Sequence, residues 1–183
     1  MSNKTLKAFS YEYSYFGPSL KEEESSSLQE QFAVVCFTET PIHQIDVLLK
    51  KVSGRRFQPE PYGLVFRKEY IRENGGNPVF YVTRKIARPL LDLIYEPYVK
   101  GKKQAPKTMC KLLSLVTVCD ERNDWHWERE WRIVGNFQFS LDKVYCGLCP
   151  EEHISYFQTR YNQVKFIDPY WTRNKILDRL TGK

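Results

Sequence analysis

The sequence predicts a single α+β domain with a mixed, mostly antiparallel sheet flanked by helices. Short segments rich in β-branched and aromatic residues predict the strands, and apolar residues at helical spacing predict the helices between them. With 183 residues, 42% of them apolar and 15% aromatic, the chain is long enough to bury one substantial core. We expect the domain to span residues 32–183, after a partly mobile N-terminal segment over residues 1–31.

The expected elements follow one another without an internal repeat or a dividing linker. Strands are predicted at 32–38, 62–66, 78–83, 113–119, 125–134, 137–139, 143–147 and 164–167. Helices are predicted at 41–51, 67–74, 84–99, 150–161 and 172–180. Pro41 and Pro150 suit a first helical turn, whereas Pro89 and Pro97 limit or kink their helix. The polar turn over residues 120–124 predicts that residues 115–134 form a hairpin.

The segment WHWEREWRIV, residues 125–134, contains three of the four tryptophans. Its alternation of bulky and polar residues predicts a half-buried strand. One face then carries Trp125, Trp127, Arg129, Trp131 and Ile133, and the other carries His126, Glu128, Glu130, Arg132 and Val134. Asp and Glu are poor strand formers, so two glutamates on one face of a strand indicate a structural or functional role at that face.

Two interpretations of this polar face remain open. In the first, it is a solvated strand surface whose charges pair with one another. Glutamates at positions i and i+2 lie about 7 Å apart and repel unless a cation such as Arg132 sits between them. In the second, the face is a pocket wall, where one glutamate acts on a ligand hydroxyl or a developing cation and Arg132 holds the other carboxylate or an anion.

Charge and cysteine content restrict the class of protein. Lys and Arg number 28 against 22 Asp and Glu, a net charge of +6, which permits a polyanionic partner without requiring one. The candidate basic patch is Lys100, Lys102, Lys103 and Lys107, and its alternative is a solvated loop. Five cysteines without a signal peptide predict reduced thiols and a cytoplasmic location, and no apolar run is long enough for a membrane span.

The sequence contains no strong metal or nucleotide motif. Cys146 and Cys149, with His153 nearby, supply only one pair at zinc-ligand spacing, so we expect no metal there but a strand, a turn and a helix with buried thiols. Neither GxGxxG nor GxxxxGK[ST] occurs, which excludes the usual phosphate loops.

Four motifs in order, FAVVCFTETPI, YGLVFRKEYI, GGNPVFYV and WEREWRIV, resemble the AbiGi-type abortive-infection proteins of bacteria and a related bacterial family of unknown function. The resemblance covers residues 32–150. It implies a role in defence against phage, in which AbiGi-type proteins are described as the antitoxin-like partner of a nucleotidyltransferase-like toxin.

A more distant resemblance is to ADP-ribosyltransferases, which bind NAD in a cleft of a split sheet and place a catalytic glutamate late in the chain. It implies that Glu130 polarises a ribose hydroxyl and stabilises the cation formed as nicotinamide leaves, with Glu128 orienting the acceptor and Arg132 beside them. Thr38, Glu39, Tyr62 and Gly63 are expected to form the opposite, cofactor-binding wall. The chain departs from that pattern because no histidine precedes His43 to grip the ribose.

Two functions are therefore expected. One is an abortive-infection protein on an ADP-ribosyltransferase-like scaffold, with NAD-dependent transfer of ADP-ribose to a macromolecule. The other is a non-enzymatic antitoxin-like module that binds a toxin, another defence protein or nucleic acid.

Overall fold

Residues 4–9, 30–52, 58–94, 97–98, 106–121 and 124–182 are described by this computed structural model of the chain. Within these ranges strands and short helices alternate, which confirms the predicted mixture of α and β structure. Most of the expected N-terminal segment over residues 1–31 lies outside the described residues.

The chain divides into two compact units. Unit 1 comprises residues 1–4, 40–71 and 138–183, and unit 2 comprises residues 5–39 and 72–137. Three elements each contain a boundary between the units: β1 (Lys4–Leu6), α4 (Lys68–Glu73) and β8 (Phe137–Phe139).

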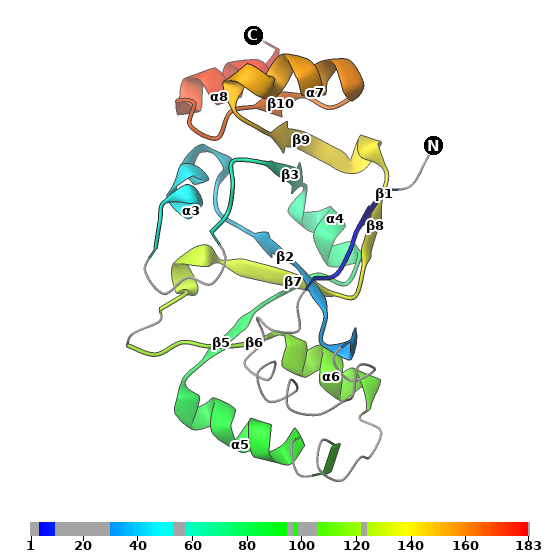
Figure 1. Cartoon of the computed structure of the whole chain (residues 1–183), viewed down its shortest axis with the longest axis vertical. Helices are drawn as coiled ribbons and strands as arrows, with labels where there is room; N and C mark the ends of the chain where they lie inside the picture. The colour runs from blue at the N-terminus through cyan, green and yellow to red at the C-terminus, as the bar shows by residue number, and fades with distance from the viewer. Residues whose placement is uncertain are drawn as a thin grey trace. The chain divides into compact units, whose positions relative to one another are not determined.

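The other elements of unit 2 are β2 (Val34–Thr38), β4 (Asn77–Pro78), β5 (Phe80–Val82), α5 (Arg84–Ile94), α6 (Lys107–Ser114), β6 (Val116–Val118), the 3-10 helix η4 (His126–Glu128) and β7 (Glu130–Val134). β7 is the central strand of a three-stranded sheet. It pairs antiparallel with β2 (Figure 1) and with β4. β5 and β6 form a separate parallel pair. Their parallel direction requires a long crossover connection, which α5 and α6 occupy.

The core of unit 2 lies beside α6. Cys110, Leu113 and Ser114 are buried on one side of this helix, at the i, i+3 and i+4 spacing of a single face. Cys110 and Leu113 pack with Phe32, which precedes β2, and with Val116 of β6. Burial of these apolar side chains fixes the helix next to the strands that carry the candidate site.

The other elements of unit 1 are η2 (Ile42–Gln44), α3 (Asp46–Leu49), β3 (Gly63–Phe66), η5 (Leu141–Lys143), β9 (Val144–Leu148), η6 (Glu151–His153), α7 (Ile154–Arg160), β10 (Phe166–Ile167) and α8 (Arg173–Thr181). β9 is central, antiparallel to β3 and parallel to β10 (Figure 1). Its core contains Cys146, Ile167 and Ile176. Thr172 caps α8 by accepting a hydrogen bond from the Lys175 backbone N–H, in agreement with the predicted start of this helix.

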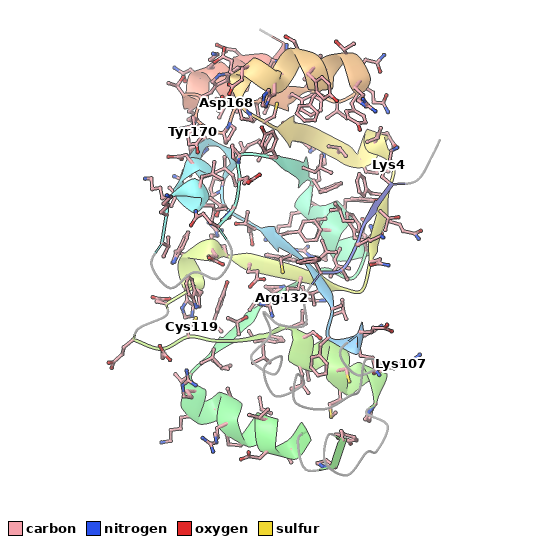
Figure 2. All side chains as sticks on the ribbon, in the orientation of Figure 1. Lys4, Lys107, Cys119, Arg132, Asp168 and Tyr170 are labelled. Atoms are coloured by element: carbon pink, nitrogen blue, oxygen red, sulfur yellow. The ribbon has the colours of Figure 1, made fainter. Side chains whose placement is uncertain are left out.

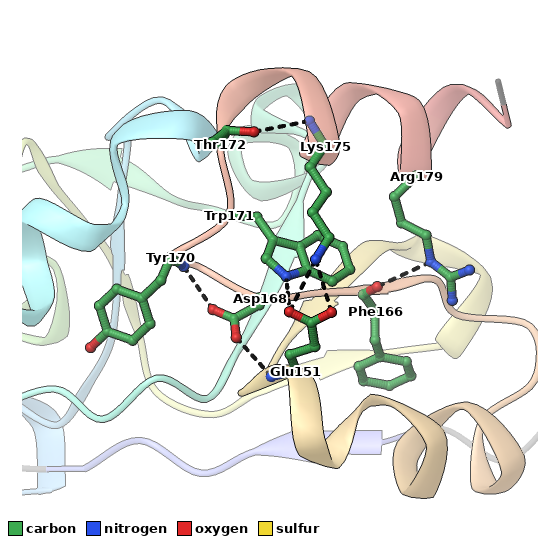
Figure 3. A network of polar contacts seen from close by, with 8 residues as sticks. All are labelled: Glu151, Phe166, Asp168, Tyr170, Trp171, Thr172, Lys175 and Arg179. Atoms are coloured by element: carbon green, nitrogen blue, oxygen red, sulfur yellow. Dashed lines mark hydrogen bonds and ion pairs between the residues drawn. The ribbon is translucent and has the colours of Figure 1, made fainter.

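A polar network ties η6, the segment after β10 and α8 together (Figure 3). Buried Asp168 accepts hydrogen bonds from the backbone N–H groups of Glu151 and Tyr170, both at 2.7 Å. The Glu151 carboxylate accepts from the Trp171 indole N–H at 2.7 Å and from Lys175 Nζ at 2.8 Å. These bonds hold the pKa of Glu151 below its usual range. Asp168 therefore joins the residue that opens η6 to the turn that precedes α8.

Gly147 is required where β9 meets β10. A Cβ atom at this position would lie 2.3 Å from Cε1 of the buried Phe166 ring. We expect Gly147→Ala to lower the free energy of unfolding by about 1–3 kcal/mol, because the ring must leave its packed position. Urea unfolding followed by circular dichroism measures the loss. The matched control is Gly63→Ala, whose Cβ meets the flexible Leu148 Cδ1 at 3.3 Å, and equal losses in the two variants would contradict the prediction.

Several predicted elements need correction. The sheet is not continuous, since the described strands form separate small sheets. The expected helix over 41–51 is divided into η2 and α3. The expected strand over 78–83 is interrupted at Val79. The Val79 backbone N–H still donates to the Glu130 carbonyl of β7 at 3.0 Å, whereas the Phe80 N–H donates to the Leu115 carbonyl at 2.8 Å, so β4 and β5 join different sheets.

The predicted hairpin over residues 115–134 is also wrong. β6 pairs in parallel with β5, whereas β7 pairs with β2 and β4. The end of α6 and β6 contact β7 through the Arg132 side chain, which donates to the Ser114 carbonyl and the Thr117 hydroxyl. This segment therefore packs on a face of β7 rather than along its edge.

Candidate functional site

The segment 125–134 is a strand only in its second half, so the prediction of a strand beginning at Trp125 is wrong. The Asp124 carboxylate accepts a hydrogen bond from the His126 backbone N–H at 3.1 Å, which favours a local turn over extension. Residues 126–128 form η4. Arg129 follows in the left-handed region with φ 48°, and β7 begins at the next residue. Such a conformation is costly for a residue with a Cβ and is typical of functional or tightly constrained positions.

β7 is buried on both faces rather than on one. Trp131, Arg132 and Ile133 are each less than 9% exposed, because β2 and β4 flank the strand and the end of α6 covers the Arg132 face. Glu130 and Arg132 do share one face, as the alternation predicts. Glu128 is not on the strand, since it ends η4.

Arg132 is the centre of the site (Figure 2). Its Nε and Nη2 atoms both donate to the Glu130 carboxylate at 2.9 Å, a two-point ion pair. Nη1 donates to the Ser114 carbonyl at 2.7 Å and Nη2 to the Thr117 hydroxyl at 2.8 Å. The Arg132 side chain is 3% exposed and that of Glu130 is 15% exposed. A buried guanidinium with this many partners is compensated, and the Glu130 carboxylate is the charge that compensates it.

Two weaker acids border this pair. Cys36 lies opposite Arg132 in the β2–β7 ladder, and desolvation together with the Glu130 charge raises the pKa of its thiol to about 12. Tyr81 of β5 accepts a hydrogen bond from the Glu130 backbone N–H at 3.0 Å. Desolvation raises the pKa of the Tyr81 hydroxyl to about 12. Both groups are therefore neutral at physiological pH, and Cys36 is not a reactive thiolate.

Thr38 ends β2 and Glu39 follows it, and both residues contact the chain around the start of β7. The Thr38 hydroxyl donates to the Glu128 carbonyl at 2.7 Å. Glu39 accepts from the Trp131 indole N–H at 2.9 Å, and its other oxygen lies 3.7 Å from Arg129 Nη2. Five of the predicted site residues therefore converge at one end of β2 and β7: Thr38, Glu39, Glu128, Glu130 and Arg132.

Tyr62 and Gly63 belong to unit 1, and their membership of a cofactor wall stays a prediction. The Tyr62 hydroxyl lies 2.8 Å from His153 Nδ1, and the two rings are stacked. Gly63 pairs with Leu148 in the β3–β9 ladder.

The remaining sequence candidates are placed as follows. Lys107 opens α6, whereas Lys100, Lys102 and Lys103 lie outside the described residues, so a nucleic-acid patch stays a prediction. Cys146 lies in β9 with its side chain buried, and Cys149 is buried just before η6. This confirms the predicted strand, turn and helix with buried thiols.

Sequence reasoning missed the residues that complete the site. Ser114, Thr117 and Tyr81 come from other elements, and no local pattern marks them as partners of β7. It also missed a group of potential metal ligands beside the site, Cys119, Asp124 and His126. The spacing Cys-x4-Asp-x-His was visible in the sequence, but the strand assigned to residues 125–134 would have pointed His126 away from Cys119.

Comparison with protein-family profiles, with curated proteins and with solved structures finds no significant match to this chain. Among the described residues, no helix has the length and apolar character needed to cross a bilayer. The function must therefore be argued from the site and from the sequence motifs.

Proposed function

We propose that this chain is an abortive-infection protein of the AbiGi type that acts by binding a toxin, on an ADP-ribosyltransferase-like scaffold that no longer cleaves NAD. The support for the defence role is the order of the four motifs over residues 32–134. The support for binding rather than catalysis is the ion pair between Glu130 and Arg132.

That ion pair is the observation that carries the proposal. Cleavage of NAD needs a carboxylate able to accept a ribose hydroxyl and to face a developing cation. Both oxygens of Glu130 already accept hydrogen bonds from Arg132, and the guanidinium is buried. A ligand that bound the Glu130 carboxylate in place of Arg132 would leave the buried Arg132 guanidinium without its counter-ion, which costs several kcal/mol. Glu130 as it stands does not fit the role of the NAD-cleaving carboxylate.

The same pair suits a recognition surface. It fixes the beginning of β7, and with it the turn formed by Glu128 and Arg129 and the end of β2. Arg129 and His126 expose more than half of their side chains there. A rigid backbone that presents exposed charged groups loses little conformational entropy when a protein partner binds.

Toxin neutralisation tests the proposal. The proposal requires a nucleotidyltransferase-like toxin gene beside the gene for this chain. Production of that toxin alone should arrest a bacterial host, and co-production of this chain should restore growth. Purified toxin and chain should form a complex by calorimetry. Absence of such a toxin gene, or arrest that this chain does not relieve, contradicts the proposal.

A second candidate is NAD-dependent transfer of ADP-ribose, which the convergence of Thr38, Glu39, Glu128 and Glu130 favours. Nicotinamide release from NAD distinguishes the two candidates. Under the binding proposal the chain releases none above the blank. Release of nicotinamide that is lost in Glu128→Gln, but kept in the exposed control Glu121→Gln, would establish the enzyme instead.

A further inference from the structure

Cys119, Asp124 and His126 bring three different metal-binding atoms to one place in unit 2. A thiol sulfur, a carboxylate oxygen and an imidazole nitrogen all lie within 4.8 Å of one another. Cys119 is buried, and the Asp124 and His126 side chains are 73% and 61% exposed. The group therefore has its sulfur in the protein and its oxygen and nitrogen at the surface, so a small ion can reach it from solvent.

The fold holds these residues by contacts outside the three side chains. The Cys119 backbone N–H donates to the Val82 carbonyl at 2.9 Å, which ties the residue to the end of β5. The Trp125 backbone N–H points at Cys119 Sγ at 3.4 Å, and the His126 backbone N–H binds the Asp124 carboxylate. The Tyr81 ring packs against the imidazole, with 4.5 Å between the ring centroids. These contacts hold Asp124, Trp125 and His126 next to Cys119.

We propose that Cys119, Asp124 and His126 form a binding site for a divalent cation of the Zn²⁺ class, with solvent in the fourth position. Sulfur and imidazole ligands select such a borderline-soft ion over Mg²⁺ or Ca²⁺, which prefer oxygen ligands alone. Binding replaces the Cys119 S–H bond by a thiolate–metal bond, and the proton leaves to solvent. The site is independent of the proposed function.

The distances suit tetrahedral coordination with small movements. His126 Nδ1 and Asp124 Oδ1 are 2.7 Å apart. Tetrahedral zinc, with ligand bonds of about 2.0–2.1 Å, separates two such atoms by about 3.3 Å, so the ion takes the place of the shared proton and the pair opens slightly. The Trp125 N–H is aimed at the sulfur and supports the thiolate after the ion binds.

The surrounding charge also favours a cation. Asp120 and Glu128 place further negative charge around Cys119. Asp120 is offset in part by Arg84, whose Nη2 lies 3.2 Å from its carboxylate. A divalent cation bound to a thiolate and one carboxylate is neutralised at the site, and the two outlying carboxylates add attraction.

The site lies next to the start of β7, so metal binding should hold the residues that lead into this strand in place. His126 opens η4, which leads through Arg129 into Glu130. Tyr81 contacts the His126 ring on one side and accepts the Glu130 backbone N–H on the other. A metal ion would fix His126 and Asp124, and so would help to hold Glu128 and Arg129 in their turn.

Metal binding by the full, tag-free chain tests the proposal. After removal of metals by a chelator, titration with Zn²⁺ in a calorimeter should give one ion per chain. Titration with Co²⁺ should give a thiolate-to-cobalt charge-transfer band together with the intense visible bands of tetrahedral cobalt. Cys119→Ser should abolish the charge-transfer band. His126→Gln and Asp124→Asn should each weaken Zn²⁺ binding by at least about tenfold.

The controls are His43→Gln and Asp142→Asn, an imidazole and an exposed carboxylate of unit 1 that lie outside the group. Both should bind one Zn²⁺ with unchanged affinity. Circular dichroism checks that each variant is folded, and the exposed positions Asp124 and His126 keep the test valid if Cys119→Ser does not fold. Failure of the unchanged chain to bind one Zn²⁺, or unaltered binding in His126→Gln and Asp124→Asn, overturns the proposal. These measurements involve neither toxin neutralisation nor nicotinamide release. Failure of the metal-site proposal can therefore be told apart from failure of the proposed function.

Discussion

Replacing Arg132 by methionine should lower the free energy of unfolding by about 3–5 kcal/mol, because Glu130 is left without its cation in a largely buried position. The Ser114 carbonyl and the Thr117 hydroxyl lose their donors as well. Urea unfolding followed by tryptophan fluorescence measures the change, and Trp131 in β7 reports directly on this unit.

Two further variants separate the charge from the packing. Glu130→Leu combined with Arg132→Met should recover most of the loss, since a buried ion pair can be replaced by apolar groups at little cost whereas a lone buried charge cannot. Arg129→Met is the matched control. Its side chain is 52% exposed and lies 3.7 Å from Glu39, so removal of its charge should change stability by no more than about 0.5 kcal/mol. A loss below about 1 kcal/mol in Arg132→Met would show that the ion pair does not support the fold.

Replacing Asp168 by alanine should cost about 2–4 kcal/mol in unit 1, because two backbone N–H groups lose a charged acceptor in a buried setting. The turn before α8 and the start of η6 should loosen together (Figure 3). Thermal and urea unfolding followed by circular dichroism and by tryptophan fluorescence, to which Trp171 of this network contributes, measures the loss.

Asp168→Asn should fall between the parent chain and the alanine variant, since its amide oxygen can replace only one of the two acceptors. The control is Asp142→Ala. That side chain is 47% exposed beside Lys143, so its removal should be nearly neutral. An alanine variant at position 168 as stable as the control would show that other contacts hold the end of β10 to α8.

The ion pair also limits which functions the cluster can perform. Five predicted residues do meet at one end of β2 and β7, so the motif identifies a real cluster of side chains. The structure differs in what each residue does there. Arg132 is buried, and Glu130 is its counter-ion. This pairing agrees with one part of the first interpretation, but the pair is buried rather than solvated, and the catalytic and pocket roles of these residues stay predictions.

Local sequence signals were reliable where one short segment decides its own conformation. The β-branched run before Thr38 and the segment at 143–147 are strands, and Thr172 caps a helix, because backbone preference and one nearby hydrogen bond suffice. These signals failed where a side chain forms a local hydrogen bond with the backbone that the alternation of residues does not reveal. Asp124 binds the backbone two residues later, which converts the alternating run at Trp125 into a turn.

Glu130 and Arg132 face the same way because alternate residues of any strand do, and the sequence is enough to predict this. The burial of this face, the central position of β7 and the meeting of Cys119 with Asp124 and His126 depend instead on contacts between distant segments. Those outcomes depend on Ser114, Thr117 and Tyr81, which are brought from α6, β6 and β5. Burial of a charge is favourable only when distant partners compensate it, and the arrangement of such partners is a property of the folded chain rather than of any one segment.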